Sequence, residues 1–280
     1  MKGYEEWNRS DELWVALYFA ANPVASSDTG LEAVLEVIEH EAGLLMPEQV
    51  AGKRRYRYTR RRAHEELARN TSQDYSWLLL ERNTKPEVLW HLSFGGNGPG
   101  LYLRFTSSPL SFFRQDEAAE ARCQQVVRVV RALCQRLGPV DYGFAHSRAD
   151  ELLGSDPHKS KPSAPPGAYE AYWLNVYGKQ LVDSLGRQRV LTLPAQSVEP
   201  LPCGGVLWLS RPTVADFDSP EARRAQARCL VHLRPELRLE EVERTLLERS
   251  LAFQPLEERF DPDIADLIEL ILQEQTDLSS

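Results

Sequence analysis

The sequence contains no long apolar run and no recognisable export signal. A transmembrane helix needs about 20 consecutive apolar residues, whereas the run at 13–20 (LWVALYFA) is much shorter. The residues before this run are polar, so it has neither the length nor the setting of a signal peptide. We therefore expect a cytoplasmic protein that does not engage a membrane.

The four cysteines match neither a metal site nor a redox motif. Cys123 and Cys134 lie on one predicted helix, so their Cα atoms would be about 16 Å apart, which is beyond disulfide reach. Cys203 falls in a predicted turn, and Cys229 lies on another predicted helix. We expect four reduced thiols, no metal and no cofactor.

Motifs for the common kinds of catalysis are also missing. The sequence has no Gly-x-Ser-x-Gly nucleophile elbow. The glycine cluster at 95–100 lacks the Gly-Lys-Ser/Thr ending of a phosphate-binding loop, and a predicted strand follows it, so it indicates a hairpin turn. His64 has no second histidine at the spacing of a zinc helix. We therefore expect a protein that is not an enzyme.

Two histidines keep a catalytic alternative open. His91 lies in the middle of a predicted strand, and His146 lies at the end of another. A single histidine on a strand is more often a hydrogen-bonded structural residue than a catalytic one. A hydrolase that uses one of them with a nearby carboxylate is the third of three hypotheses below.

Composition and charge are those of an ordinary acidic globular protein. Apolar residues make up 42% of the 280 positions and charged residues 26%, which predicts a packed core. The formal net charge of −8 disfavours a general nucleic-acid binder and suits solubility or a basic partner.

The pattern of apolar residues predicts an α+β fold with helices packed on an antiparallel sheet. Short connections between predicted strands favour antiparallel pairing, and amphipathic spacing predicts helices between and after them. The predicted strands of the first half are 13–20, 76–81, 88–94, 101–105 and 140–146, and its predicted helices are 31–43 and 116–137.

A segment rich in Pro, Ser and Gly at 154–167 separates the chain into halves 1–153 and 168–280. It is a linker between two units or a long surface loop of one continuous domain. After it, Trp173, Tyr177, Leu181 and Leu185 recur every four residues, which predicts one helix that ends at Gly186. Strands at 190–193 and 205–210 and extra C-terminal helices at 220–233, 239–247 and 261–272 follow.

The run at 53–62 combines basic and aromatic residues. Seven of its ten residues are basic and two are tyrosines, a combination found in single-stranded nucleic-acid sites. The alternative interpretation is an exposed strand whose arginines face water or pair with carboxylates. If the run binds nucleic acid, the candidate residues are Arg54, Arg55, Tyr56, Arg57, Tyr58 and Arg60.

Two acidic groups offer a surface for a basic partner. The first precedes the predicted helix at Ser219-Pro220, where carboxylates also suit a helix start and a metal site is a weaker alternative. The second surrounds the start of the last predicted helix, and the loop tip at Asn97 is a further candidate. The acidic candidates are Asp216, Asp218, Glu257, Glu258, Asp261, Asp263 and Asp266.

The stretch 171–233 resembles the immunity-protein-52 family, bacterial proteins paired with polymorphic or type VI secretion toxins. The resemblance lies in YWLNVYG (172–178), LGR (185–187), LPA (193–195), LP (201–202), GGVL (204–207), DFD (216–218) and Pro220-Glu221. It implies an α+β protein without enzymatic activity that binds a cognate toxin, often a nuclease, whose gene is adjacent. These motifs are structural, so Trp173, Tyr177 and Trp208 are expected in the core.

Three hypotheses follow. The first is a binding protein that neutralises a cognate toxin by occluding its active or assembly surface. The second is a nucleic-acid-binding regulator that uses 53–62, which the net charge disfavours. The third is the histidine-dependent hydrolase.

Overall fold

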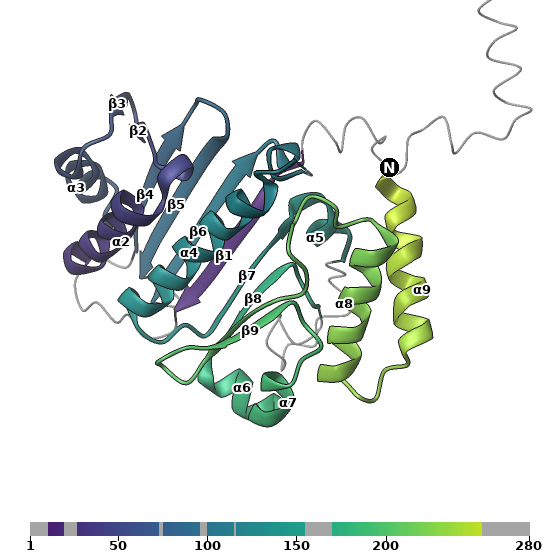
Figure 1. The fold of residues 1–280 in the computed structure, drawn as a ribbon. Coiled ribbons are helices and arrows are strands. Elements are labelled where there is room, and N and C mark those ends of the chain that lie inside the picture. Colours follow the sequence, from purple (N-terminus) through teal and green to yellow (C-terminus); the bar gives the residue numbers. More distant parts are fainter. Residues whose placement is uncertain are drawn as a thin grey trace, which may run out of the picture.

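The computed structural model describes residues 11–19, 27–72, 75–95, 100–114, 116–154 and 170–253. Its centre is one ten-stranded antiparallel sheet with the strand order β3-β2-β4-β5-β6-β1-β7-β8-β10-β9 (Figure 1). Helices pack on this sheet, and two of them, α8 and α9, follow it at the C-terminal side of the described chain. The predicted α+β fold with an antiparallel sheet and extra C-terminal helices is therefore confirmed.

The bounds of the elements are as follows. The strands are β1 (Leu13–Phe19), β2 (Gln49–Ala51), β3 (Arg55–Arg57), β4 (Tyr75–Arg82), β5 (Glu87–Gly95), β6 (Leu101–Ser108), β7 (Tyr142–Ser147), β8 (Leu174–Tyr177), β9 (Ser197–Pro200) and β10 (Val206–Leu209). The helices are α2 (Ser27–Glu41), α3 (Arg60–Arg69), α4 (Ala119–Leu137), α5 (Arg148–Gly154), α6 (Lys179–Leu185), α7 (Arg187–Leu191), α8 (Pro220–Leu233) and α9 (Leu239–Ser250). Short 3₁₀ turns occupy Gly43–Leu45, Leu110–Phe113 and Leu251–Phe253.

Helices α2 and α4 cover one face of the sheet. Their apolar stripes, predicted from i, i+3, i+4 spacing, are fully buried; Leu31, Leu35, Val126 and Val130 have no exposed surface. They pack against alternate residues of β1, β4, β5 and β6, which point to the same side because side chains alternate along a strand. This layer is the larger of the two apolar cores.

A second core lies on the opposite side of the sheet, at its other end. Here Tyr142 and Phe144 of β7, Tyr177 of β8 and Trp208 of β10 pack with residues of α6, α7 and α8. Trp173, Tyr177 and Trp208 have no exposed surface, so their predicted place in the core is confirmed. The end of the sheet formed by β7, β8 and β10 is therefore covered on both sides, because Val176 and Leu207 of these strands lie in the first core.

The predicted helix through 173–185 is wrong in its first part. Leu174–Tyr177 is strand β8, and the helix α6 begins only after Gly178. A spacing of four places Trp173 and Tyr177 on one side in a strand as well as in a helix, so the repeat could not separate the two. The predicted strand at 190–193 is also wrong, because Arg187–Leu191 is the short helix α7.

Local start and stop signals in this half were predicted correctly. Gly186 ends α6 with a positive φ of 91°, a conformation that favours glycine. Ser219 begins α8, and its hydroxyl accepts a hydrogen bond from the Ala222 amide at 3.1 Å, as an N-cap does.

The sheet crosses the boundary that the sequence suggested. Strand β7 from the first half pairs with β8 from the second, in register from Tyr142 opposite Tyr177 to Ala145 opposite Leu174. The predicted linker at 154–167 falls, except for its first residue, outside the described residues, as does the predicted helix at 261–272. Within the described part of the chain, no helix has the length and apolarity needed to cross a bilayer.

Candidate functional site

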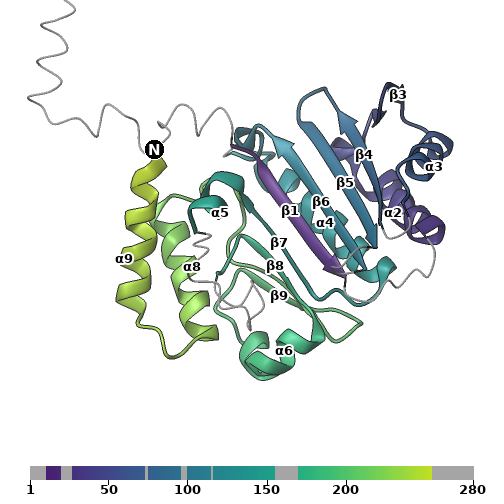
Figure 2. The same ribbon diagram turned by 180° about the vertical axis from the view of Figure 1, so that it is seen from behind.

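Four strands leave one side of the sheet without a helix over it in the described chain. On the side away from α2 and α4, no described helix lies over strands β4, β5, β6 and β1 (Figure 2). The end of this side nearest β7 is not fully exposed, because Ala16 is completely buried in the second core and Trp14, Tyr18 and Tyr102 pack against that core. We call this side of the four strands the open face. Its side chains are Tyr75, Trp77, Leu79, Glu81, Leu89, His91, Ser93, Tyr102, Arg104, Thr106, Trp14, Ala16 and Tyr18.

The strand register arranges these residues in rows across the sheet. One row is aromatic at three of its four positions: Trp77 opposes Ser93, Ser93 opposes Tyr102, and Tyr102 opposes Tyr18. The rings of Tyr18 and Tyr102 are 4.8 Å apart between centroids. The Ser93 hydroxyl is hydrogen-bonded to the Tyr75 hydroxyl at 2.9 Å. The row therefore carries three rings, with the Ser93 hydroxyl between those of Trp77 and Tyr102.

The adjacent row contains the arginine of the face. Leu79 opposes His91, His91 opposes Arg104, and Arg104 opposes Ala16. Burial, and secondarily the charge of Arg104, lowers the pKa of His91 below its usual value. His91 is therefore neutral at pH 7, and its Nε2 is hydrogen-bonded to the Ser93 hydroxyl at 3.1 Å.

The third row ends at Trp14, which lies under two cations. Leu89 opposes Thr106, and Thr106 opposes Trp14. The guanidinium carbons of Arg148 and Arg104 are 3.8 Å and 5.2 Å from the centre of the Trp14 rings, within the range of cation–π attraction. Large rings and guanidinium groups are thus held in fixed positions on a rigid sheet.

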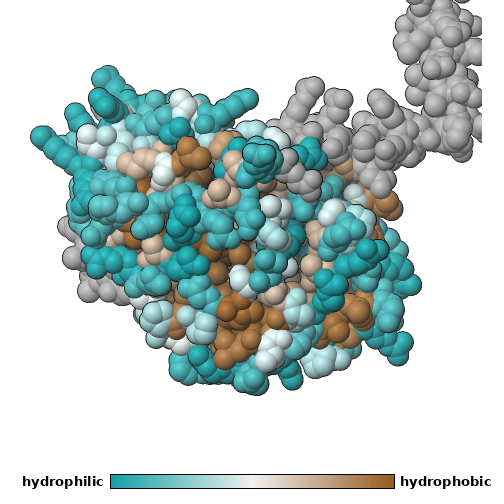
Figure 3. Space-filling view, in the orientation of Figure 1, coloured by the Kyte–Doolittle hydropathy of each residue, from teal (hydrophilic) through white to brown (hydrophobic). Residues whose placement is uncertain are grey.

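This composition is unusual for an outward-facing sheet. An antiparallel sheet that packs helices on one side usually shows polar residues on the other. Here about half of the outward positions carry large apolar or aromatic side chains, and these are half-buried except for the exposed Tyr75. The remaining outward positions are polar or charged, apart from the buried Ala16. By contrast, the surface over α2 and α4 is mostly hydrophilic (Figure 3). Contiguous apolar surface rimmed by polar residues marks interaction sites, so the open face is the best candidate.

The sequence analysis did not identify the open face, although a signal for it was present. The runs LWVALYF, SWLLLE and VLWHLSF place apolar residues on both sides of each strand. Such runs are typical of strands that are covered on both faces. One face is covered by α2 and α4, and the apolar residues on the other side of these strands are the half-buried side chains of the open face.

The acidic candidates are not assembled into one site within the described residues. Asp216 accepts a hydrogen bond from the Thr213 hydroxyl at 2.7 Å and lies 3.9 Å from Nε of the buried Arg211. Burial raises the pKa of Asp218. Both are half-buried near the start of α8. The other candidates, Glu257, Glu258, Asp261, Asp263 and Asp266, and the loop tip Asn97 lie outside the described residues.

The basic run forms the edge strand β3 and the start of α3, and much of its charge is already paired. Arg55 bonds Glu81 at 2.7 Å, and Arg60 contacts Glu39 at 2.6 Å and Glu32 at 3.0 Å. The Tyr58 hydroxyl donates to Glu39 at 2.8 Å. The Tyr56 ring lies 4.9 Å from the guanidinium of Arg62, while Arg54 and Arg57 are exposed. The pairing with carboxylates leaves few free cations for phosphates.

His146 lies in a buried polar cluster at the junction of β7, α5, α8 and α9. Its Nε2 is 2.6 Å from the Asp150 carboxylate, and its Nδ1 accepts from the Trp173 amide at 3.3 Å. Arg223 and Arg249 contact the same carboxylate. His146, Asp150 and Arg223 have no exposed side-chain surface, which counts against a catalytic use of His146.

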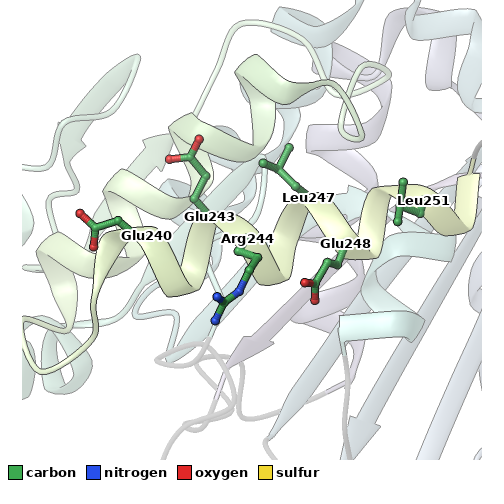
Figure 4. Close-up of a pocket in the computed structure, with 6 residues that line it drawn as sticks. All are labelled: Glu240, Glu243, Arg244, Leu247, Glu248 and Leu251. Carbon is green, nitrogen blue, oxygen red and sulfur yellow. The ribbon is translucent and has the colours of Figure 1, made fainter.

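A shallow groove of about 470 Å³ runs along the outer side of α9. All of its lining residues come from this one helix and the turn after it: Glu240, Glu243, Arg244, Leu247, Glu248 and Leu251 (Figure 4). Acidic, basic and apolar side chains alternate along it without converging on a point. Among the described residues, no group of three or more His, Cys, Asp or Glu side chains is placed to hold a metal ion.

Comparison with known proteins gives a match of fold to a solved structure. No family model matches the sequence, and no curated protein matches it. The structure is similar to that of the Pseudomonas aeruginosa T6SS protein PA0821, with a TM-score of 0.55 and 15% sequence identity. The match covers 86% of this chain and 81% of that chain. At this identity, the similarity is one of fold.

Proposed function

We propose that the protein is an immunity protein that binds and neutralises a cognate secreted toxin, in association with a type VI secretion system, and has no enzymatic activity. The observation that carries the proposal is the open face, an aromatic surface without a covering helix in the described chain. The fold shared with a T6SS protein and the resemblance of 171–233 to an immunity family support the same function.

The open face has the composition of a protein-binding surface. Tryptophan, tyrosine and arginine dominate the binding energy of protein interfaces, and Trp14, Tyr18, Trp77, Tyr102 and Arg104 all lie on it. Two χ angles fix a tyrosine or tryptophan, so ordering these side chains costs little on binding. A toxin that docks here would bury rings that are already held by the sheet.

The size of the face fits the centre of an interface. Four strands about 4.8 Å apart, each about seven residues long with a rise of about 3.4 Å, span on the order of 450 Å². A stable interface buries about 800 Å² on each partner. Loops and helices around the face would therefore contribute the rim. Asp216 and Asp218, and the acidic candidates at 257–266, are proposed as further contacts for a basic partner such as a nuclease.

The function is tested by co-expression with the product of the adjacent gene. We expect the two proteins to co-purify, and we expect cells that express the toxin to survive only when this protein is present. If the wild-type protein neither binds that product nor protects cells from it, the proposed function is wrong.

Substitutions then test the face. Trp77→Ala and Tyr102→Ala remove rings from the aromatic row, and each should weaken binding by about 30-fold or more, since interface hot spots contribute about 2 kcal/mol or more. Leu44→Ala is the matched control, because Leu44 is 50% exposed in the 3₁₀ turn that follows α2. Folded Trp77 and Tyr102 variants that bind and protect like the wild type would place the interface elsewhere.

A further inference from the structure

Arg104 occupies the middle of the open face. It lies on β6, between His91 of β5 and Ala16 of β1, and its side chain is half-buried. Its guanidinium carbon is 5.2 Å from the centre of the Trp14 rings. Stacking on an aromatic ring leaves the N–H donors at the edge of the guanidinium plane free to bind an oxygen acceptor.

The charge of Arg104 is not compensated by an ion pair with any residue that the structure describes. Arg148, which shares the Trp14 ring, is paired with Glu151. The Glu12 carboxylate is close enough to attract both arginines, but its side-chain hydrogen bond is to Thr106, and it forms no ion pair with Arg104. The neighbouring His91 cannot supply a negative charge in either protonation state.

An unpaired guanidinium at the centre of an interface constrains the partner. When a partner covers the open face and excludes water, an uncompensated buried charge is strongly destabilising. A carboxylate that binds the guanidinium in the same step removes this penalty and adds charge-assisted hydrogen bonds. A partner with only apolar side chains at this point would bind weakly.

The charges around Arg104 favour a partner that presents one carboxylate over a nucleic acid with its chain of phosphates. Carboxylates lie at one end of the face, at Glu81 and Glu87, and Glu12 is close enough to interact with Arg104. A nucleic acid carries a charge at every nucleotide and needs several cations to bind it, so these carboxylates would repel it. A single acidic residue can pair with Arg104 while its apolar neighbours pack on the rings. Its one charge then stays away from Glu81 and Glu87.

We propose that Arg104 is the anchor of the open face and that the partner places one Asp or Glu carboxylate on it, flanked by apolar side chains that pack on Tyr102 and Trp14. This inference rests on the proposed function, since the partner is taken to be the toxin. It adds the chemistry by which the toxin is selected: an acidic residue within an apolar segment.

The test measures binding of the purified product of the adjacent gene by calorimetry. Arg104→Glu should weaken binding by about 100-fold or more and Arg104→Gln by about 30-fold, since truncating a buried charge pair costs about 2–5 kcal/mol. Arg104→Lys keeps the charge but loses bidentate geometry, and it should lie between Arg104→Gln and the wild type. Arg128→Glu makes the same charge change at an exposed site of α4, behind the other face, and should change affinity less than twofold.

The outcomes separate this inference from the proposed function. A toxin variant with Lys in place of one Asp or Glu should restore binding to Arg104→Glu and so identify the carboxylate. If all folded Arg104 variants bind like the wild type, the anchor is wrong and the proposed function stands. If the wild type does not bind the gene product, the proposed function and the anchor both fail. If the wild type instead binds a single-stranded oligonucleotide and Arg104→Glu abolishes this, the occupant is a nucleic acid and the inference is overturned.

Discussion

Arg223 donates hydrogen bonds from both terminal guanidinium nitrogens to the carboxylate of Asp150, at 2.7 Å and 2.8 Å, and both side chains are completely buried. The pair joins α8 to α5, the helix that directly follows strand β7. His146 and Arg249 bind the same carboxylate from β7 and α9. Burial alone would raise the pKa of Asp150, but Arg249, Arg223 and His146 outweigh burial and hold it well below its usual range.

Replacing Asp150 should therefore strongly destabilise the protein. Asp150→Ala leaves the buried Arg223 and the nearly buried Arg249 without their acceptor, so we expect the free energy of unfolding to fall by about 3–5 kcal/mol. The double variant Asp150→Leu with Arg223→Met removes both charges and should lose less than Asp150→Ala. Urea unfolding followed by circular dichroism measures both. A loss below about 1 kcal/mol for Asp150→Ala would contradict a structural function for the cluster.

The stability of the protein should depend on pH through His146. Burial lowers the pKa of His146 to about 4, although Asp150 opposes this shift. Between pH 6.5 and 4 the unfolded chain binds a proton at this site and the folded chain does not, so stability falls as the pH is lowered. The full effect is about 3 kcal/mol.

Asp11 contributes a pH dependence of stability with the opposite sign, so the experiment uses the variant Asp11→Asn. Burial raises the pKa of Asp11 to about 7, against hydrogen bonds from the Ala149 amide and Ser147. Between its unfolded value and pH 7 the folded state holds the extra proton, so stability falls as the pH rises. We expect Asp11→Asn to lose more stability between pH 6.5 and 4 than the wild type loses. Adding His146→Gln to Asp11→Asn should remove about 3 kcal/mol of the stability that Asp11→Asn loses between pH 6.5 and 4, and an unchanged pH dependence would contradict the assignment.

Gly178 should not tolerate a side chain. A Cβ at Gly178 would lie 2.2 Å from the carbonyl oxygen of Val140 and 2.7 Å from that of Asp141, and these backbone atoms cannot rotate away. We expect Gly178→Ala to destabilise the protein by about 1–3 kcal/mol or more, as overpacking does. Gly186→Ala is the comparison, because its Cβ meets nothing closer than 3.9 Å and it suffers only from the positive φ, at about 1–2 kcal/mol. Thermal unfolding of the two variants compares the destabilisation caused by the steric clash at Gly178 with that caused by the backbone strain at Gly186.

The basic run should not support nucleic-acid binding. Because Arg55 and Arg60 are paired with glutamates, we expect no measurable affinity for a single-stranded oligonucleotide in 50 mM salt by fluorescence anisotropy. Binding that weakens steeply with salt and is lost in Arg54→Ala with Arg57→Ala would instead revive the nucleic-acid hypothesis.

Helices with regular spacing and clear end signals could be predicted from the sequence. Leu31 and Ile38 of α2, Val126 and Leu137 of α4, and the Ser219 cap of α8 each depend on neighbours within a few residues. Long apolar strands with short connections also led to the correct fold class. The stretch 173–177 failed because a four-residue repeat is shared by strands and helices, and only pairing with β7 and β10 makes it a strand.

The sequence by itself therefore determined the α+β class, most element positions and the acidic charge, because these follow from local spacing and composition. Only the tertiary structure decided which apolar positions are covered. It brought Asp150 and Arg223 together across 73 residues, and it placed α2 and α4 on one side of β1, β4, β5 and β6 and left the rings of the other side open. Both outcomes depend on how distant elements pack, and local sequence patterns do not predict that packing.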